Sequence, residues 1–346
     1  MSCPVKVCQH RCEDRATAFH KKNDEAVTET SAIGIPVAAP DPGLTQHVSR
    51  TDRDRQPKLQ DQGFSPPAAC AIIAAMNLVV FAIAAVILYL LTSAALTVRL
   101  AGNLSGLRVS RPAVLVLGFG AVILHALALY PELMTGHGLD MGFFNAASLV
   151  ALLTVTLLLL TALRQPVENL GIPVLPLAAV TLALAAWNPG SPRDITHTSW
   201  QLDLHILFSV LAYSLFVLAA VQAVLLQIQD RHLRTRRPGG FIRALPPLEV
   251  MERLLFQMIG TGFALLSAAL LTGMVFLEDI FAQHLVHKTV LSIVSWVIFG
   301  VLLWGRWRFG WRGRTAIRWT LSGFAFLILA YFGSKLVLEL ILHRSA

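Results

Sequence analysis

Eight apolar stretches of about 20 residues follow one another between residues 76 and 340, and they constrain the fold more than any other feature. A helix of that length crosses the hydrocarbon core of a bilayer, where only helices and closed barrels satisfy their backbone hydrogen bonds. We expect the short fourth stretch, with Pro173 and Pro176 near its start, to be tilted, broken or shallow. The sequence predicts an all-α polytopic membrane bundle with spans at Met76–Val98, Ala113–Tyr130, Gly142–Leu163, Ile172–Trp187, Leu204–Ile228, Met251–Leu277, Lys288–Trp304 and Ala316–Leu340.

Composition agrees with a multi-pass membrane protein rather than a soluble domain with one anchor. Hydrophobic residues make up 55% of the chain and charged residues only 14%, against about 25% charged residues in soluble domains. The formal net charge is +8, but the arginines gather in short loops between apolar stretches. We therefore expect membrane lipids as partners and no nucleic acid.

The loop charges predict an orientation. Cytoplasmic loops of membrane proteins carry an excess of Lys and Arg. The loops after the first, fifth and seventh spans are rich in arginine, whereas the loops between them are neutral or acidic apart from an uninformative loop with Arg164 and Glu168. This pattern places the arginine loops in the cytoplasm and both chain ends outside. The arginines concerned are Arg99, Arg108, Arg111, Arg231, Arg234, Arg236, Arg237, Arg243, Arg306, Arg308, Arg312 and Arg314.

The first 75 residues differ from the rest of the chain. They are polar and irregular, without the pattern of a signal peptide, so we interpret 1–75 as a disordered or misassigned extension and 76–343 as the transmembrane domain. One hypothesis is that translation begins at Met76. Cys3, Cys8 and Cys12, with His10 between them, match no regular zinc spacing. No cysteine follows Met76, so we expect no disulfide in the membrane body, and any haem must be bound without a covalent link.

Enzyme motifs are absent from the sequence, which contains no phosphate-binding glycine loop, no G-x-S-x-G elbow and no H-E-x-x-H helix. We predict no catalytic residues and no enzyme activity. Histidine, a ligand for metals and haem iron, is the remaining candidate. His125, His205, His287 and His343 all fall toward the predicted outer side.

Each of these histidines has two interpretations. His287 and His343 lie at span ends, where polar rings commonly mark the membrane interface. His125 lies inside a span, where an ionisable residue is rare, yet it could simply hydrogen-bond a neighbouring helix. His205 opens the fifth span, with Ser209 and Tyr213 on the same helical face. As cofactor-binding candidates we take His205, His125, His343 and His287.

Several segments resemble the cytochrome c assembly family, which includes the CcsA, CcmC and HemX-like haem-handling proteins. These segments are Trp200 with His205 and Leu211–Ser214, Met251–Arg253, Ile259–Phe263, Leu271–Phe276, Lys288–Trp296, Gly310–Arg314 and Leu329–Ser334. The resemblance is strong from Trp200 to Ser334, extends from Met76 onward, and is greatest to the YpjD branch of bacterial inner-membrane proteins.

The resemblance implies non-covalent binding of haem b at the outer face and a role in cytochrome c maturation or haem handling, with other maturation proteins as partners. His205 corresponds to the first external haem ligand of the family, and His343 falls close to the second. The family's tryptophan-rich haem platform is missing between Glu278 and His287, and Trp304 stands where an embedded histidine is expected. Two alternatives therefore stay open. One is a non-haem scaffold or regulator of a partner membrane protein or haem-synthesis enzyme, and the other is a small-molecule permease.

Overall fold

A computed structural model describes residues 68–101, 110–135, 138–139, 142–165, 167–188, 200–234, 245–276 and 286–333 of this chain. The chain divides after Phe64 into two units, and the described residues all belong to Ser65–Ala346. The predictions for Cys3, Cys8 and Cys12 and for most of the 1–75 extension lie outside the described residues. The first helix of the described part of the chain begins at Ala68, before Met76.

The described chain is helical apart from one small hairpin. The helices are α2 (Ala68–Ala101), α3 (Arg111–Leu133), α4 (Phe143–Arg164), α5 (Gly171–Trp187), α6 (Trp200–Arg234), α7 (Leu248–Phe276), α8 (Val286–Phe309) and α9 (Arg314–Ile328). A 3₁₀ turn, η1 (Glu168–Leu170), precedes α5, and a π-turn, η3 (Leu329–Gly333), continues α9. Strands β1 (Met134–Thr135) and β2 (Gly138–Leu139) pair antiparallel between α3 and α4.

All eight predicted spans are confirmed. Eight helical segments among the described residues are long and apolar enough to cross a membrane, and each overlaps one predicted span. The longest, α6, has 35 residues, or about 50 Å of helix. Because this exceeds the roughly 30 Å hydrocarbon core, α6 extends beyond the core at one end or both.

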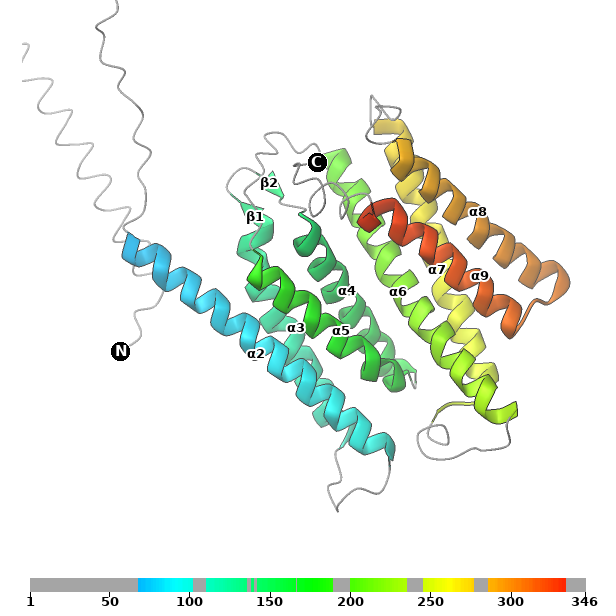
Figure 1. The fold of residues 1–346 in the computed structure, drawn as a ribbon, viewed down its shortest axis with the longest axis horizontal. Helices are drawn as coiled ribbons and strands as arrows, with labels where there is room; N and C mark the ends of the chain where they lie inside the picture. The colour runs from blue at the N-terminus through cyan, green and yellow to red at the C-terminus, as the bar shows by residue number, and fades with distance from the viewer. Residues whose placement is uncertain are drawn as a thin grey trace, which may run out of the picture. The chain divides into compact units, whose positions relative to one another are not determined.

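The eight helices form two four-helix rings (Figure 1). In the first ring α2 packs on α3, α3 on α4 and α4 on α5, and α5 returns to α2. The second ring repeats this order with α6, α7, α8 and α9. The two rings meet mainly where α4 packs against α6. Buried apolar side chains from both rings form one continuous core, with Phe216 of α6 stacked on Phe299 of α8 at 4.0 Å between ring centroids.

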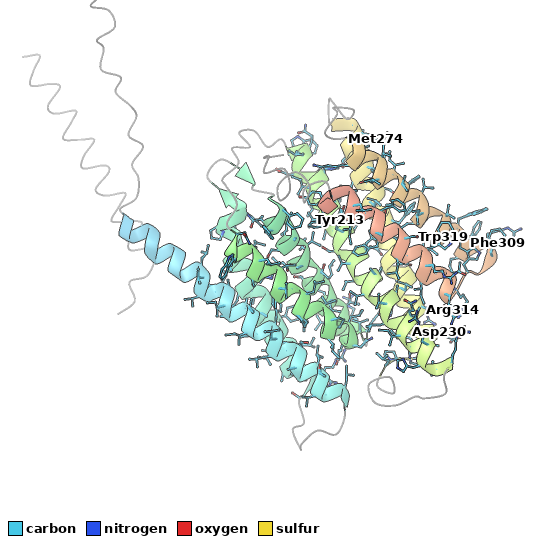
Figure 2. All side chains as sticks on the ribbon, in the orientation of Figure 1. Tyr213, Asp230, Met274, Phe309, Arg314 and Trp319 are labelled. Carbon is cyan, nitrogen blue, oxygen red and sulfur yellow. The ribbon has the colours of Figure 1, made fainter. Side chains whose placement is uncertain are left out.

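Acidic side chains hold the arginine-rich helix ends together. In the first ring Glu168 pairs with Arg99 at 2.9 Å and with Arg111 at 2.6 Å. In the second ring Asp230 of α6 pairs with Arg314 of α9 at 3.2 Å, close to the helix ends labelled in Figure 2. The loop charges did not assign Glu168 to either side of the membrane. Its ion pairs place it at the same end of its ring as the arginines of α2 and α3.

The fourth span is an unbroken helix rather than two pieces. Proline has no backbone N–H, so Pro176 leaves the carbonyl four residues earlier without its helical donor. That carbonyl belongs to Ile172, and it accepts a hydrogen bond from the Ser93 hydroxyl of α2 at 3.0 Å. Since a neighbouring helix satisfies the freed group, α5 continues from Gly171 to Trp187 with Pro176 inside it.

Candidate functional site

A cavity of about 530 Å³ opens in the second ring, near the helix ends opposite the arginines. Its walls come from α6, α7, α8, α9 and η3, and α4 adds Ala146 and Val150. Its volume lies within the range of about 300–1,000 Å³ that is usual for small-molecule sites. His205, Ser209 and Tyr213, which the sequence places on one face of a helix, all line this cavity.

The ring of His205 is held from the side of α7. Its Nδ1 lies 2.8 Å from the carbonyl oxygen of Ala269 and 3.4 Å from the hydroxyl of Thr272. A carbonyl oxygen can only accept, so Nδ1 carries the proton and donates it. In a neutral imidazole the other nitrogen, Nε2, then has the lone pair.

A glycine makes this arrangement possible. A Cβ atom at Gly273 would lie 3.1 Å from Cε1 and 3.2 Å from Nδ1 of His205, closer than the 3.5–4.0 Å of ordinary carbon contacts. The imidazole therefore packs directly against the backbone of α7. Among the described residues, Nε2 has no hydrogen-bond partner, and it is the nitrogen left for a ligand.

The rest of the cavity is largely apolar, and α8 adds a group of polar side chains. Apolar side chains of α6, α7 and α9 form most of the wall, whereas Lys288, Thr289 and Ser292 contribute polar groups from the first turns of α8. The π-turn η3 brings Ala330, Tyr331 and Phe332 to the cavity. Short π segments inside α-helices are frequent at functional sites. The Tyr213 hydroxyl donates to the carbonyl of Leu327 just before this turn.

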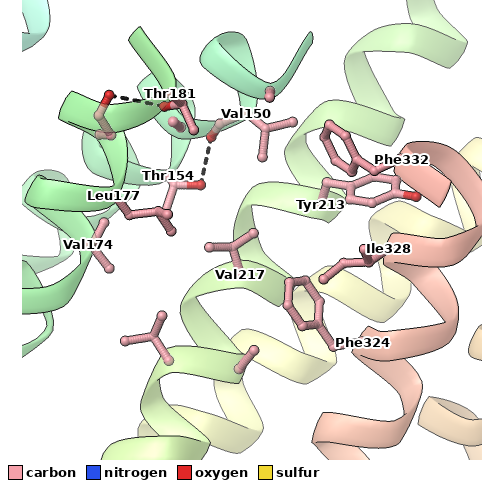
Figure 3. A pocket seen from close by; sticks show the side chains of 15 residues that line it. Val150, Thr154, Val174, Leu177, Thr181, Tyr213, Val217, Phe324, Ile328 and Phe332 are labelled. Atoms are coloured by element: carbon pink, nitrogen blue, oxygen red, sulfur yellow. Dashed lines mark hydrogen bonds between the residues drawn. The ribbon is translucent and has the colours of Figure 1, made fainter. Parts of the chain in front are cut away.

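A smaller cavity of about 280 Å³ lies beside the first, between α4 and α5 of one ring and α6, α9 and η3 of the other (Figure 3). Its walls are almost entirely apolar. The hydroxyls of Thr154 and Thr181 donate to carbonyls of their own helices, at 2.6 Å and 3.0 Å. Val150, Tyr213 and Phe332 line both cavities. This space offers hydrocarbon contact, and its lining residues include no His, Cys, Asp or Glu.

His125 occupies a different environment. It is fully buried in the first ring, where its Nδ1 lies 3.0 Å from the Tyr89 hydroxyl of α2 and its Nε2 lies 2.9 Å from the Ser148 hydroxyl of α4. The residue lines neither cavity. Both imidazole nitrogens of His125 are hydrogen-bonded and join three helices, so binding iron would require breaking one of these bonds.

The other two candidate histidines give no side-chain geometry. His287 lies in the first turn of α8, but its side chain is outside the described residues, as is the whole of His343. Among the described residues, no group of three or more His, Cys, Asp or Glu side chains could hold a metal ion. His205 is thus a single imidazole in a largely apolar cavity, which suits a metal whose remaining ligands come from an organic ring.

Sequence reasoning did not single out the residues that orient His205. Ala269 acts through its carbonyl, which every residue type provides. Gly273 acts through the absence of a side chain, and its only signal was its place inside the Leu271–Phe276 resemblance. Lys288 is visible in the sequence as the first residue of a span, but only the packing of α8 brings it to the cavity of His205.

The family model described as "Cytochrome C assembly protein" matches residues 113–342, well over half of the chain. The chain belongs to the cytochrome c assembly protein family. The matched range includes His205, Gly273 and Lys288, and with them the whole larger cavity.

Individual relatives agree with this family. "Inner membrane protein YpjD" of Escherichia coli (strain K12) is 34% identical over 227 residues, which are 64% of this chain and 84% of YpjD. "Uncharacterized 28.8 kDa protein in nifR3-like 5'region" of Azospirillum brasilense is 35% identical over 189 residues, 53% of this chain and 69% of that protein. "Protein HemX" of Brevibacillus brevis is 23% identical over 159 residues, 44% of this chain and 58% of HemX. No solved structure matches. With eight candidate spans in the described part of the chain, this member of the family is a multi-pass inner-membrane protein.

Proposed function

We propose that this protein binds haem b non-covalently in the larger cavity, where Nε2 of His205 would bind the iron, and that it handles haem during cytochrome c maturation. The observation that carries the proposal is the bond from Nδ1–H of His205 to the Ala269 carbonyl. Metal-binding histidines almost always donate their second ring N–H in this way, because the bond fixes the tautomer and the ring orientation.

The cavity walls fit the same ligand. Haem is a flat apolar ring with two carboxylates, and it needs hydrocarbon contact over most of its surface. The cavity supplies apolar walls from α6, α7 and α9 and polar groups from α8. Bound haem would supply a redox-active iron, while the protein holds the iron through His205 and shields the ring from water.

The proposal also includes an orientation, with the His205 cavity facing outside. Its support is the positive-inside rule applied to the arginines, which lie at the opposite helix ends: Figure 2 shows Asp230 and Arg314 at one end of the second ring and Met274, beside the cavity, at the other. In a cysteine-free background, Asn188→Cys should react with a membrane-impermeant maleimide in intact cells and Arg231→Cys should not. The reverse labelling pattern would overturn this orientation.

Haem uptake tests the main proposal. Detergent-purified full-length protein titrated with haem should develop a Soret band, and His205→Gly should weaken it, with partial recovery when free imidazole is added. His232→Gly is a matched control, because His232 lies at the other end of α6 and its Nδ1 also bonds a backbone carbonyl, that of Ile228 at 2.9 Å. Wild-type protein that takes up no haem, or a His205→Gly variant with an unchanged spectrum, would refute the proposal. Copurification of a stable partner protein with a colourless wild type would favour the scaffold alternative.

A further inference from the structure

Lys288 is the charged residue of the His205 cavity. Of the described residues that line this cavity, none other is Lys or Arg, and none is Asp or Glu. Thr289 and Ser292 follow on α8 and line the same cavity. Together they place an ammonium group and two hydroxyls on α8, whereas the ring of His205 is held against α7.

The position of Lys288 along its helix permits an ordinary interpretation. It is the first residue of the seventh span, Lys288–Phe309, and lysines at span ends commonly extend their ammonium group to the water boundary. An interfacial anchor of that kind has no need to face the inside of the bundle. Lys288 is half-buried and lines an internal cavity together with a histidine whose Nε2 is available for a ligand.

We propose that Lys288 binds a carboxylate of the ligand held at His205, so that the cavity selects a planar apolar ring that carries an acidic group. This inference rests on the proposed function and adds the part of the ligand that the cavity recognises besides the metal. A carboxylate in a largely apolar cavity needs a charged partner, because burial of an unpaired charge is costly. A charge-assisted bond from an ammonium is stronger than a neutral one, so the ammonium of Lys288 is the group that would distinguish an acid from its ester.

The ligand chemistry separates this role from that of His205. Haem has free propionates, whereas haem dimethyl ester has the same ring and iron with both carboxylates methylated. Lys288→Gln should weaken haem binding by about ten- to a hundredfold, the range for a lost hydrogen bond to a charged group, and should leave binding of the dimethyl ester within about twofold of wild type. Lys288→Arg should retain the preference for the acid, because a guanidinium also binds carboxylates.

Ser292→Ala is the matched control, since it changes the same wall of the cavity without removing a charge. Ser292→Ala should retain most of the preference for haem over the dimethyl ester. If Lys288→Gln loses affinity for haem and ester equally, or for neither, the inference is wrong while haem binding at His205 stands. If wild-type protein binds neither compound, the proposed function itself fails. Equal thermal midpoints of the apo variants would establish that a loss of affinity is not a loss of folding.

Discussion

Substitution of Gly273 tests the link between the backbone of α7 and the ring of His205. Gly273 is on α7, one helical turn after Ala269, whose carbonyl accepts the Nδ1–H bond. A Cβ at Gly273 would lie 3.1 Å from Cε1 of His205. Restoring an ordinary carbon contact moves the ring about 0.4 Å away from α7.

That movement has a calculable effect on the hydrogen bond. The Nδ1 to oxygen distance of 2.8 Å would become about 3.2 Å, the upper limit for an N–H to oxygen bond. We expect Gly273→Ala to lower haem affinity only a few-fold. Gly273→Val adds two more methyl groups on that Cβ and should break the bond, and losing such a supporting bond typically costs 10–100-fold in metal affinity.

The assay is a Soret-monitored haem titration of detergent-purified variants. Gly260→Ala is the control, because Gly260 is also on α7 and its added Cβ would meet nothing within 4 Å. The expected order of affinity is wild type and Gly260→Ala, then Gly273→Ala, then Gly273→Val. If Gly273→Val bound haem as tightly as wild type, the ring of His205 would not depend on its contact with α7, and the argument for its tautomer would fail.

Three further predictions concern stability. Tyr89→Phe leaves Nδ1 of His125 without its partner at 3.0 Å. The thermal midpoint should fall by the equivalent of about 0.5–1.5 kcal/mol, and haem affinity should not change. An unchanged midpoint would contradict a structural role for His125. Glu252→Gln removes the carboxylate that binds the turn between α8 and α9, so hydrogen exchange of the backbone amides in that turn should accelerate. The side chain of Glu249 is 81% exposed and lies 3.9 Å from Arg312, so Glu249→Gln should leave the exchange rates unchanged. Gly313 has φ +56°, so Gly313→Ala should lower the free energy of unfolding by about 1–3 kcal/mol. An unfolding free energy equal to that of wild type would show that the turn adopts another backbone conformation without cost.

The arginine turn itself shows how one carboxylate organises several groups. Glu252 of α7 is buried, yet it pairs with Arg312 at 3.0 Å and accepts a bond from the backbone N–H of Gly313. The bond to Glu252 raises the pKa of the Arg312 guanidinium further above its usual range. Trp311 lies over Gly305, where a Cβ would meet its ring at 2.4 Å. These contacts explain why α8 and α9 can be joined by a turn as short as residues 310–313.

Much of the fold could be predicted because the bilayer imposes a local rule. Each span must be apolar over about 20 residues, and that requirement is visible in a short window of sequence. Eight spans followed from it, as did the common face of His205, Ser209 and Tyr213 on one helix. Of the three possibilities for the fourth span (tilted, broken or shallow), a broken helix was wrong, because the compensating hydroxyl of Ser93 comes from a helix 79 residues earlier, and sequence patterns do not report such a distant partner.

The sequence by itself determined the eight apolar spans that the described residues confirm, the end of the bundle that carries the arginines, and the presence of histidine rings in spans where polar groups are costly. Only the tertiary structure decided what those rings do. In the folded protein both nitrogens of His125 are hydrogen-bonded, one to Tyr89 and one to Ser148. One nitrogen of His205 is hydrogen-bonded to the backbone of α7, and the other lies beside a cavity. The physical reason is that a hydrogen bond depends on atoms a few ångströms apart, and in a helical bundle those atoms belong to segments that are far apart in the chain.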